Sequence, residues 1–297
     1  MQAPGTPTIR IGYFPGCSLH GGGRDYDESV RAVSRAAGVE LVEIPDWNCC
    51  GATAAHSVNK KLALALPARN LALAREAGLE VVFAPCAACY NRLLSAHRAL
   101  EEGGASTHDL PTLIGRSYDG RLRVVNAVEY ASDIVMRRLP TPSESRLSGV
   151  RLVSYYGCLL VRPPKVTKFD DPEDPTSMDK ILSALGATVL DWEYKVECCG
   201  AGHSLARTDI VLKLASRILA AAREAGADGI VTACPMCHTN LDLRQMGVMR
   251  KEGLKAGIPV YYLTEIIGLA AGIDEAVLGV KRHYIAAKGL TARQKAI

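Results

Sequence analysis

Apolar residues in the first half of the chain form short runs that alternate with segments of helical spacing. The runs are rich in β-forming residues and bounded by turn residues, which predicts strands at residues 8–14, 39–45 and 79–85. Helical spacing predicts helices at residues 25–37 and 58–77. Pro67 lies inside the second of these helices and should kink or restart it, because proline lacks the N–H that a helix interior uses.

The second half of the chain repeats this order of elements. Apolar runs predict strands at residues 150–156, 187–192 and 228–234, and helical spacing predicts helices at residues 176–185 and 206–225. Helices that alternate with apolar strands are typical of parallel βαβ units, so we expect an α/β fold. In such folds the loops at the carboxyl ends of the strands build the functional site.

The repeat extends to the residues themselves. The stretches AREAGLEVVFAPCAAC and AREAGADGIVTACPMC align without a gap from Ala74 and Ala222. IRIGYFPGC likewise matches VRLVSYYGC as a strand that ends in glycine and cysteine. We therefore expect two pseudo-symmetric domains, residues 1–140 and 150–297, joined by a Pro- and Ser-rich linker at about residues 136–149.

Composition and charge narrow the functional classes. A hydrophobic content of 48% and a charged content of 22% are those of a globular protein. The net charge of +4 is modest and no long run of like charges occurs, which argues against nucleic-acid binding. We see no signal peptide and no uninterrupted apolar stretch long enough for a membrane span, so we expect a cytoplasmic protein. Neither a P-loop nor a Gly-x-Gly-x-x-Gly motif is present, so no flavin or NAD site is expected in this chain.

The ten cysteines fall into two groups of five with the same pattern. Each group has a single cysteine, a long gap, a Cys-Cys-Gly-Ala stretch, another long gap and a Cys-x-x-Cys motif. The first group is Cys17, Cys49, Cys50, Cys86 and Cys89, and the second is Cys158, Cys198, Cys199, Cys234 and Cys237. In a cytosolic chain such cysteines are expected to be metal ligands or catalytic thiols rather than disulfides.

The number of thiols in each group favours one chemistry. Structural zinc takes four ligands, and a Cys-x-x-Cys redox dithiol uses two. Iron–sulfur clusters are held by thiolates and often use Cys-x-x-Cys, so iron–sulfur ligation suits the groups best. A fifth thiolate and a vicinal pair suggest a cluster that departs from the cubane.

This pattern resembles the cysteine-rich CCG domains, and two copies in a chain of this length resemble the B subunit of heterodisulfide reductase. The resemblance covers nearly the whole chain and is carried by the stretches YFPGC, WNCCGA, YYGCLLVRP, ECCGAGHS, ACPMCHTNLD and LGVKRHY. It implies two noncubane 4Fe–4S clusters, one held by each group of five cysteines, which together form a disulfide-cleaving site. The chain would then be the catalytic subunit of an oxidoreductase acting on sulfur groups.

The resemblance also implies partners. The ferredoxin-like C subunit and the flavin-containing A subunit of such a complex would deliver electrons, and the substrate would be a small disulfide or thiol, or a sulfur-carrier protein. The polar loop at residues 162–175 and the C-terminal tail are candidate docking surfaces, although the loop is more simply a surface loop. Leu159 stands where the methanogen enzymes are expected to have a polar residue or histidine, which leaves the substrate open.

Other residues near the cysteines have supporting roles in this hypothesis. Four histidines could orient a cluster or donate a proton, more plausibly through hydrogen bonds than as ligands: His20, His56, His203 and His238. Gly51 and Gly200 follow the vicinal pairs and would let the backbone approach the metal closely.

Two alternatives remain open at the level of sequence. One is an iron–sulfur electron-transfer subunit of another oxidoreductase, of the glycolate or lactate oxidation, thiol:fumarate reductase or benzoyl-CoA reductase type. Such chains often carry an additional ferredoxin-like segment, which this chain lacks. The other is a protein in which one of the two sites holds structural zinc.

Overall fold

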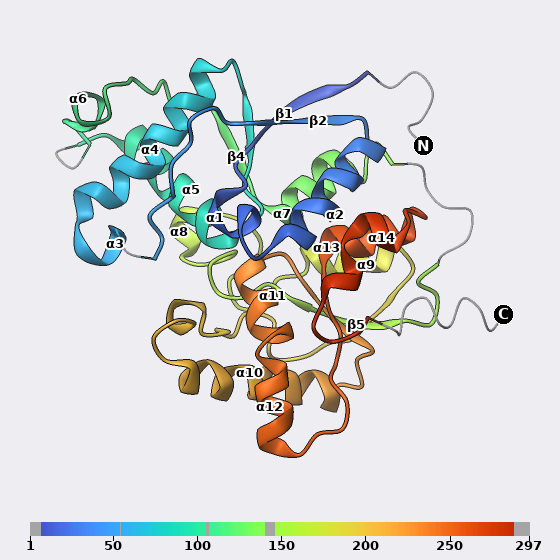
Figure 1. Ribbon diagram of the computed structural model, residues 1–297. Coiled ribbons are helices and arrows are strands. Elements are labelled where there is room, and N and C mark those ends of the chain that lie inside the picture. Colours follow the sequence, from blue (N-terminus) through green and yellow to red (C-terminus); the bar gives the residue numbers. More distant parts are fainter. Residues whose placement is uncertain (1–6, 54, 105–106, 140–145, 288–297) are drawn as a thin grey trace.

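Two four-stranded parallel sheets form the framework of the molecule (Figure 1). The computed structural model describes residues 7–53, 55–104, 107–139 and 146–287. Strand order is β2-β1-β3-β4 in the first sheet and β6-β5-β7-β8 in the second, so the two halves share one topology. The α/β prediction with two similar parallel-sheet copies is confirmed.

The first half contains four strands and the helices that connect them. The strands are β1 (Ile9–Tyr13), β2 (Val39–Glu43), β3 (Val81–Phe83) and β4 (Arg123–Val125). The helices are α1 (Gly16–His20), α2 (Arg24–Ala36), α3 (Ala55–Val58), α4 (Lys60–Glu76), α5 (Ala87–Glu102), α6 (Leu110–Ile114), α7 (Ala127–Glu129) and the π-helix η1 (Tyr130–Val135).

The second half repeats the plan with its own additions. Its strands are β5 (Arg151–Tyr155), β6 (Thr188–Val189), β7 (Gly229–Thr232) and β8 (Val260–Tyr262). Its helices are α8 (Pro164–Thr167), α9 (Ser177–Ala184), α10 (Thr208–Glu224), α11 (Pro235–Asp242), α12 (Gln245–Glu252), α13 (Leu263–Ala270) and α14 (Glu275–Leu278), with the 3-10 helices η2 (Ala201–His203) and η3 (Val280–Arg282).

Of the two effects expected of Pro67, a kink or a restart of the helix, the restart does not occur. The helix α4 runs through Pro67 without restarting, and the break in this region lies earlier, between α3 and α4. Asn59 caps the new helix, because its side-chain oxygen accepts hydrogen bonds from the backbone N–H groups of Lys61 and Leu62. This cap, rather than the proline, sets where the helix begins.

The two halves pack against each other through helices (Figure 1). The helices α13 and α14 of the second half lie on α2 of the first. At this contact the rings of Tyr26 and Tyr262 stack with centroids 4.0 Å apart, and the hydroxyl groups of Ser29 and Thr264 are 2.7 Å apart. Because these groups are fully or almost fully buried, the halves share a continuous core.

Two expectations about the chain's periphery fall partly outside the described residues. Residues 140–145 of the expected linker and residues 288–297 of the tail are not described. Within the described part of the chain, no helix is both long and apolar enough to cross a lipid bilayer.

Candidate metal centre

All ten cysteines follow the carboxyl ends of parallel strands. In the first half, Cys17 lies in α1 after β1, the vicinal pair follows β2, and Cys86 is the N-cap of α5 after β3. The second half repeats this arrangement after β5, β6 and β7, where Cys234 is the N-cap of α11. The first and third strands of each set are neighbours, on either side of the point where the connections change face, and ligands of open α/β sheets bind at this point.

Each group of five sulfurs is drawn together in the same way. The sulfurs of Cys50 and Cys89 lie 3.3 Å apart, and those of Cys199 and Cys237 lie 3.6 Å apart. The vicinal pairs also have matching backbone bonds: Gly51 N–H donates to Cys49 Sγ at 3.4 Å and Gly200 N–H donates to Cys198 Sγ at 3.3 Å. We call the two groups the first and second quintets.

Each quintet has an inner and an outer part. The inner sulfurs belong to the buried residues Cys50, Cys86, Cys89, Cys199, Cys234 and Cys237. Cys17, Cys49 and Cys198 are exposed, and Cys158 is intermediate. A group bound by a quintet would therefore have one dry side and one side open to solvent.

The two quintets meet at the first cysteine of each Cys-x-x-Cys motif. The thiols of Cys86 and Cys234 lie close enough to perturb each other: their interaction raises the pKa of Cys86 well above its usual value. The pKa of Cys234 is lowered, first by Cys237 and then by Cys86. The two quintets therefore lie near each other at Cys86 and Cys234.

The close approach of the thiols lowers the pKa of some of them and raises the pKa of others. The interaction of Cys50 with Cys89 lowers the pKa of Cys50 to about 7, and a hydrogen bond with Cys158 lowers the pKa of Cys198 to about 6. The pKa of Cys158 is raised by the same interaction. Thiolates are metal ligands whereas thiols are not, so a bound cation would be needed to ionise all members of a quintet together.

Two glycines that the sequence reasoning missed lie against the sulfurs. Gly16 and Gly157 have φ angles of +63° and +65°, and a Cβ atom on either would lie 2.9 Å from a sulfur, that of Cys89 or Cys237. Each directly precedes the single cysteine of its half, which was the available signal. Gly51 and Gly200 also have positive φ angles, but added Cβ atoms there would meet aliphatic side chains and α10 backbone.

The spacing of the sulfurs is too wide for one compact tetrahedral ion. With Zn–S bonds near 2.3 Å, the sulfurs around zinc lie under about 4 Å from one another. Among the residues described here, the one set of three metal-binding side chains with donor atoms all within 4.8 Å is Asp25, His238 and His283, which contains no cysteine. Ten soft thiol donors spread in two quintets fit a larger inorganic core held by thiolates.

The expected histidines lie in different surroundings. His20 pairs with Glu43 at 3.0 Å and meets Trp47 edge-on. His56 is exposed in α3, while the charge of His203 contributes to lowering the pKa of Cys198. Of these three, His203 has a visible electrostatic effect on a sulfur, and the supporting roles of all of them stay predictions.

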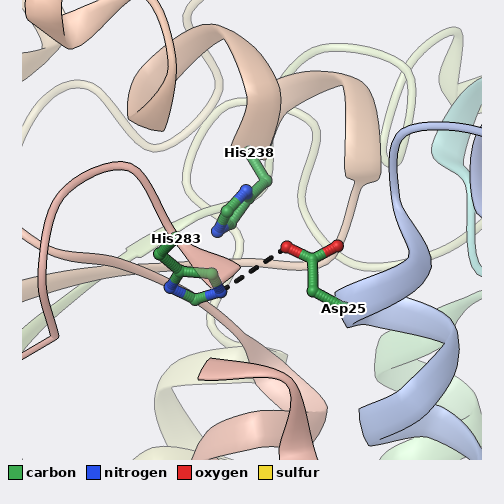
Figure 2. Close-up of side chains that lie close together, drawn as sticks. All are labelled: Asp25, His238 and His283. Carbon is green, nitrogen blue, oxygen red and sulfur yellow. Dashed lines mark ion pairs between the residues drawn. The ribbon is translucent and has the colours of Figure 1, made fainter. Parts of the chain in front are cut away.

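His238 belongs to a buried polar network beside the second quintet. Figure 2 shows it next to His283, with Asp25 of the first half opposite. His238 Nε2 donates to the Val260 carbonyl at 3.0 Å, and His283 Nε2 donates to Glu265 at 2.9 Å, with Asp25 at 3.7 Å. These contacts connect Asp25 of the first half to His238 and His283 of the second half.

Comparison with known proteins identifies the family. The model of the cysteine-rich domain called CCG matches residues 11–94 and 152–242, so each half carries one copy of it. The chain belongs to the cysteine-rich CCG domain family. Both matched ranges contain the single cysteine, the vicinal pair and the Cys-x-x-Cys motif of their half, which confirms the resemblance drawn from the sequence.

Two relatives of the CCG chain are described as a subunit of an oxidoreductase or as similar to one. It is 33% identical to a protein of Archaeoglobus profundus described as like the B subunit of heterodisulfide reductase, over 92% of this chain and 94% of the relative. It is 32% identical to the 8-methylmenaquinol:fumarate reductase membrane anchor subunit of Wolinella succinogenes, over 94% of this chain and 98% of the relative. The match extends across both CCG copies in each case.

A solved structure shares the fold of the CCG chain. A hypothetical protein from Helicobacter pylori superposes with a TM-score of 0.71 at 14% identity. The superposition covers 95% of this chain and 53% of that chain. At this identity the likeness concerns the fold alone.

Proposed function

We propose that each quintet holds one noncubane 4Fe–4S cluster, and that the chain is the B subunit of a heterodisulfide reductase or of a related complex. Cys17, Cys49, Cys50, Cys86 and Cys89 would bind the first cluster, and Cys158, Cys198, Cys199, Cys234 and Cys237 the second. The reaction would be reduction of a disulfide, or oxidation of thiols or sulfur-carrier thiols in the reverse direction.

The observation that carries this proposal is the placement of ten cysteines as two groups of five at the carboxyl ends of the two sheets, with Cys86 of one group near enough to Cys234 of the other for each to shift the other's pKa. A single redox group would need one quintet. Cleavage of a disulfide consumes two electrons and two protons and yields two thiols, and two adjoining clusters would each supply one electron. The duplication of the chain thus matches the stoichiometry of the reaction.

The residues around the quintets support this chemistry. Backbone N–H groups of Gly51 and Gly200 donate to sulfurs of the vicinal pairs, and such bonds tune the potential of thiolate-bound clusters. The exposed outer sulfurs leave one side of each quintet accessible to a substrate. His203, whose charge helps to lower the pKa of Cys198, is the residue proposed to donate a proton to a departing thiolate.

The electrons would come from other subunits of the complex. The chain has no Gly-x-Gly-x-x-Gly or P-loop motif for a flavin or nicotinamide cofactor. We propose a ferredoxin-like C subunit and a flavin-containing A subunit as its electron donors, in a cytoplasmic complex. The relationship to subunits of multi-subunit reductases supports such partners.

The test is turnover of a disulfide by the anaerobically purified chain with dithionite-reduced methyl viologen. We expect viologen oxidation that depends on the disulfide, together with an EPR signal that changes when the thiol product is added. A chain that holds iron and sulfide but reduces no member of a panel of disulfides would contradict the proposed activity.

A second function is favoured by one specific observation. The relative from Wolinella succinogenes is matched along almost its whole length and belongs to a fumarate reductase. In that case the clusters would pass electrons to a partner protein without cleaving a disulfide. Fumarate-dependent viologen oxidation in the native complex, with no response to disulfides, would identify this function.

A further inference from the structure

The two halves meet at two equivalent places, here called the open and the closed place, which differ in the loop that follows the single cysteine of one half. The motif repeat pairs Gly21 and Gly22 with Arg162 and Pro163, because each lies four or five residues after the single cysteine of its half. It also pairs His238 and Thr239 with Tyr90 and Asn91, which follow the Cys-x-x-Cys motifs. Each place is therefore bordered by the loop of one half and the helix of the other.

At the closed place the loop of the second half fills the space. Asn91 donates from Nδ2 to the carbonyl of Arg162 at 2.9 Å and to that of Leu159 at 3.3 Å. The Tyr90 hydroxyl reaches the carbonyl of Thr167 at 3.5 Å. The polar loop after Cys158 is thus held against the first half by these hydrogen bonds.

At the open place glycines stand where the other loop has Arg162 and Pro163. A pocket of about 290 Å³ lies between residues 21–25 and the segments that carry Thr239 and Tyr284. This volume is near the lower end of ligand pockets, so it suits a small molecule or one end of a larger one. A Cβ atom on Gly22 would meet no protein atom within 4 Å, so nothing in the protein occupies that space.

The charged side chains that line the pocket indicate the charge of its ligand. Asp242 already accepts hydrogen bonds from the backbone N–H groups of Tyr284 and Ile285, and Arg282 is held by Glu28 at 2.8 and 3.0 Å. Asp25 accepts from the backbone N–H of Tyr26 and faces His283. Among the described residues that line the pocket, Arg24 is the charged side chain that has no hydrogen bond or ion pair.

We infer that this pocket binds the negatively charged end of the thiol or disulfide substrate and that Arg24 selects for it. The inference rests on the proposed function and deepens it. The pocket is lined by segments that carry a cysteine of each quintet, since Gly21 lies four residues after Cys17 and His238 directly follows Cys237. A carboxylate on the ligand would pair with the guanidinium of Arg24 through charge-assisted hydrogen bonds.

The experiment compares two disulfides of similar size, anionic dithiodipropionate and neutral hydroxyethyl disulfide, in the viologen assay. Arg24→Gln should raise KM for dithiodipropionate about tenfold and leave KM for hydroxyethyl disulfide unchanged, because only the first loses an ionic partner. Arg24→Lys should restore part of the loss. Gly22→Leu should lower kcat/KM for both disulfides, since the new side chain fills the pocket without a strained backbone.

The matched control is Arg217→Gln, which removes an arginine from a different pocket of about 290 Å³ beside Cys198. This variant should leave both KM values unchanged. Equal effects of Arg24→Gln on the two disulfides, or no effect on either, would overturn the assignment. All variants should keep the iron and sulfide content of the parent chain.

A binding measurement separates failure of this inference from failure of the proposed function. Mercaptopropionate should raise the thermal midpoint of the parent chain and not that of Arg24→Gln, because a ligand stabilises the state that binds it. If the parent reduces no disulfide yet shows this difference, the proposed function fails and the pocket assignment stands. If the parent is active and mercaptopropionate shifts both chains alike, the pocket assignment fails alone.

Discussion

At the scale of single residues, the glycines before Cys17 and Cys158 show how closely the backbone approaches the quintets. Gly16 and Gly157 combine a left-handed backbone with a sulfur at 2.9 Å from any added Cβ atom. The left-handed backbone and the nearby sulfur each disfavour a side chain at these positions. The sulfur belongs in each case to a buried cysteine. The sequence showed a glycine at both positions but could not show which atom lies opposite it.

Gly16→Ala should therefore damage the first quintet and spare the second. The left-handed backbone costs roughly 1–2 kcal/mol for alanine, and displacement of Cys89 adds to it. We expect the iron content of the purified chain to fall by about half. Gly22→Ala is the control, since its Cβ meets nothing within 4 Å, and an equal loss of iron there would refute the explanation.

The pair of Glu265 and His283 makes stability depend on pH. Burial raises the pKa of Glu265 from 4.5 to about 7. Burial alone would lower the pKa of His283, but its hydrogen bond to Glu265 and the nearby carboxylates raise it above 6.5. Both folded-state pKa values lie above the unfolded ones, so the folded chain holds more protons and loses stability as the pH rises from 4.5 through neutrality.

Glu265→Gln should weaken this dependence. The parent chain is expected to have a thermal midpoint several degrees higher near about pH 6 than near about pH 8, and the variant a smaller difference. Scanning calorimetry under anaerobic conditions measures both. A parent chain whose midpoint rises over the same range would show that the sign of the linkage is wrong.

At the scale of elements, the docking of α2 against α13 joins the two halves. Ser29 donates to the carbonyl of Tyr26 at 2.9 Å and lies 2.7 Å from the hydroxyl of Thr264, in a region with almost no exposed surface. A buried hydroxyl without a partner is costly, whereas loss of both partners is nearly neutral. The contact therefore specifies how the helices align more than it adds net stability.

A double-mutant cycle tests this role of the contact. Ser29→Ala should lower the free energy of unfolding by about 1–2 kcal/mol, because it leaves the Thr264 hydroxyl without an acceptor. Adding Thr264→Val should return most of that loss. Urea titration of the four chains gives the interaction energy, and strictly additive effects would mean that the two hydroxyls do not interact.

The helices and strands of the structure also show which elements could be predicted from the sequence. Long periodic segments were predicted well: the helix expected at residues 206–225 is α10, and the strand expected at residues 150–156 is β5. The strands β4 and β8 were not predicted from the sequence. They form through tertiary pairing with β3 and β7, which no local pattern encodes.

At the scale of the whole molecule, duplication places two equal sets of thiols at the ends of two equal sheets. The spacing of the cysteines predicted the two sets, since the repeat is visible in the chain. It could not predict that Cys86 and Cys234 meet, nor that Asp25, His238 and His283 bridge the halves, because these contacts join residues more than 140 positions apart. The broken symmetry between the glycine loop and the loop at residues 162–175 likewise appears only in three dimensions.

The metal content of the anaerobically purified chain tests the central claim most directly. We expect about eight irons and about eight sulfides per chain, with about half of both lost in Cys158→Ser and in its counterpart Cys17→Ser. No stoichiometric zinc should be found. About four irons with one zinc, or cysteine variants that keep the full iron content, would contradict the presence of two clusters held by two quintets.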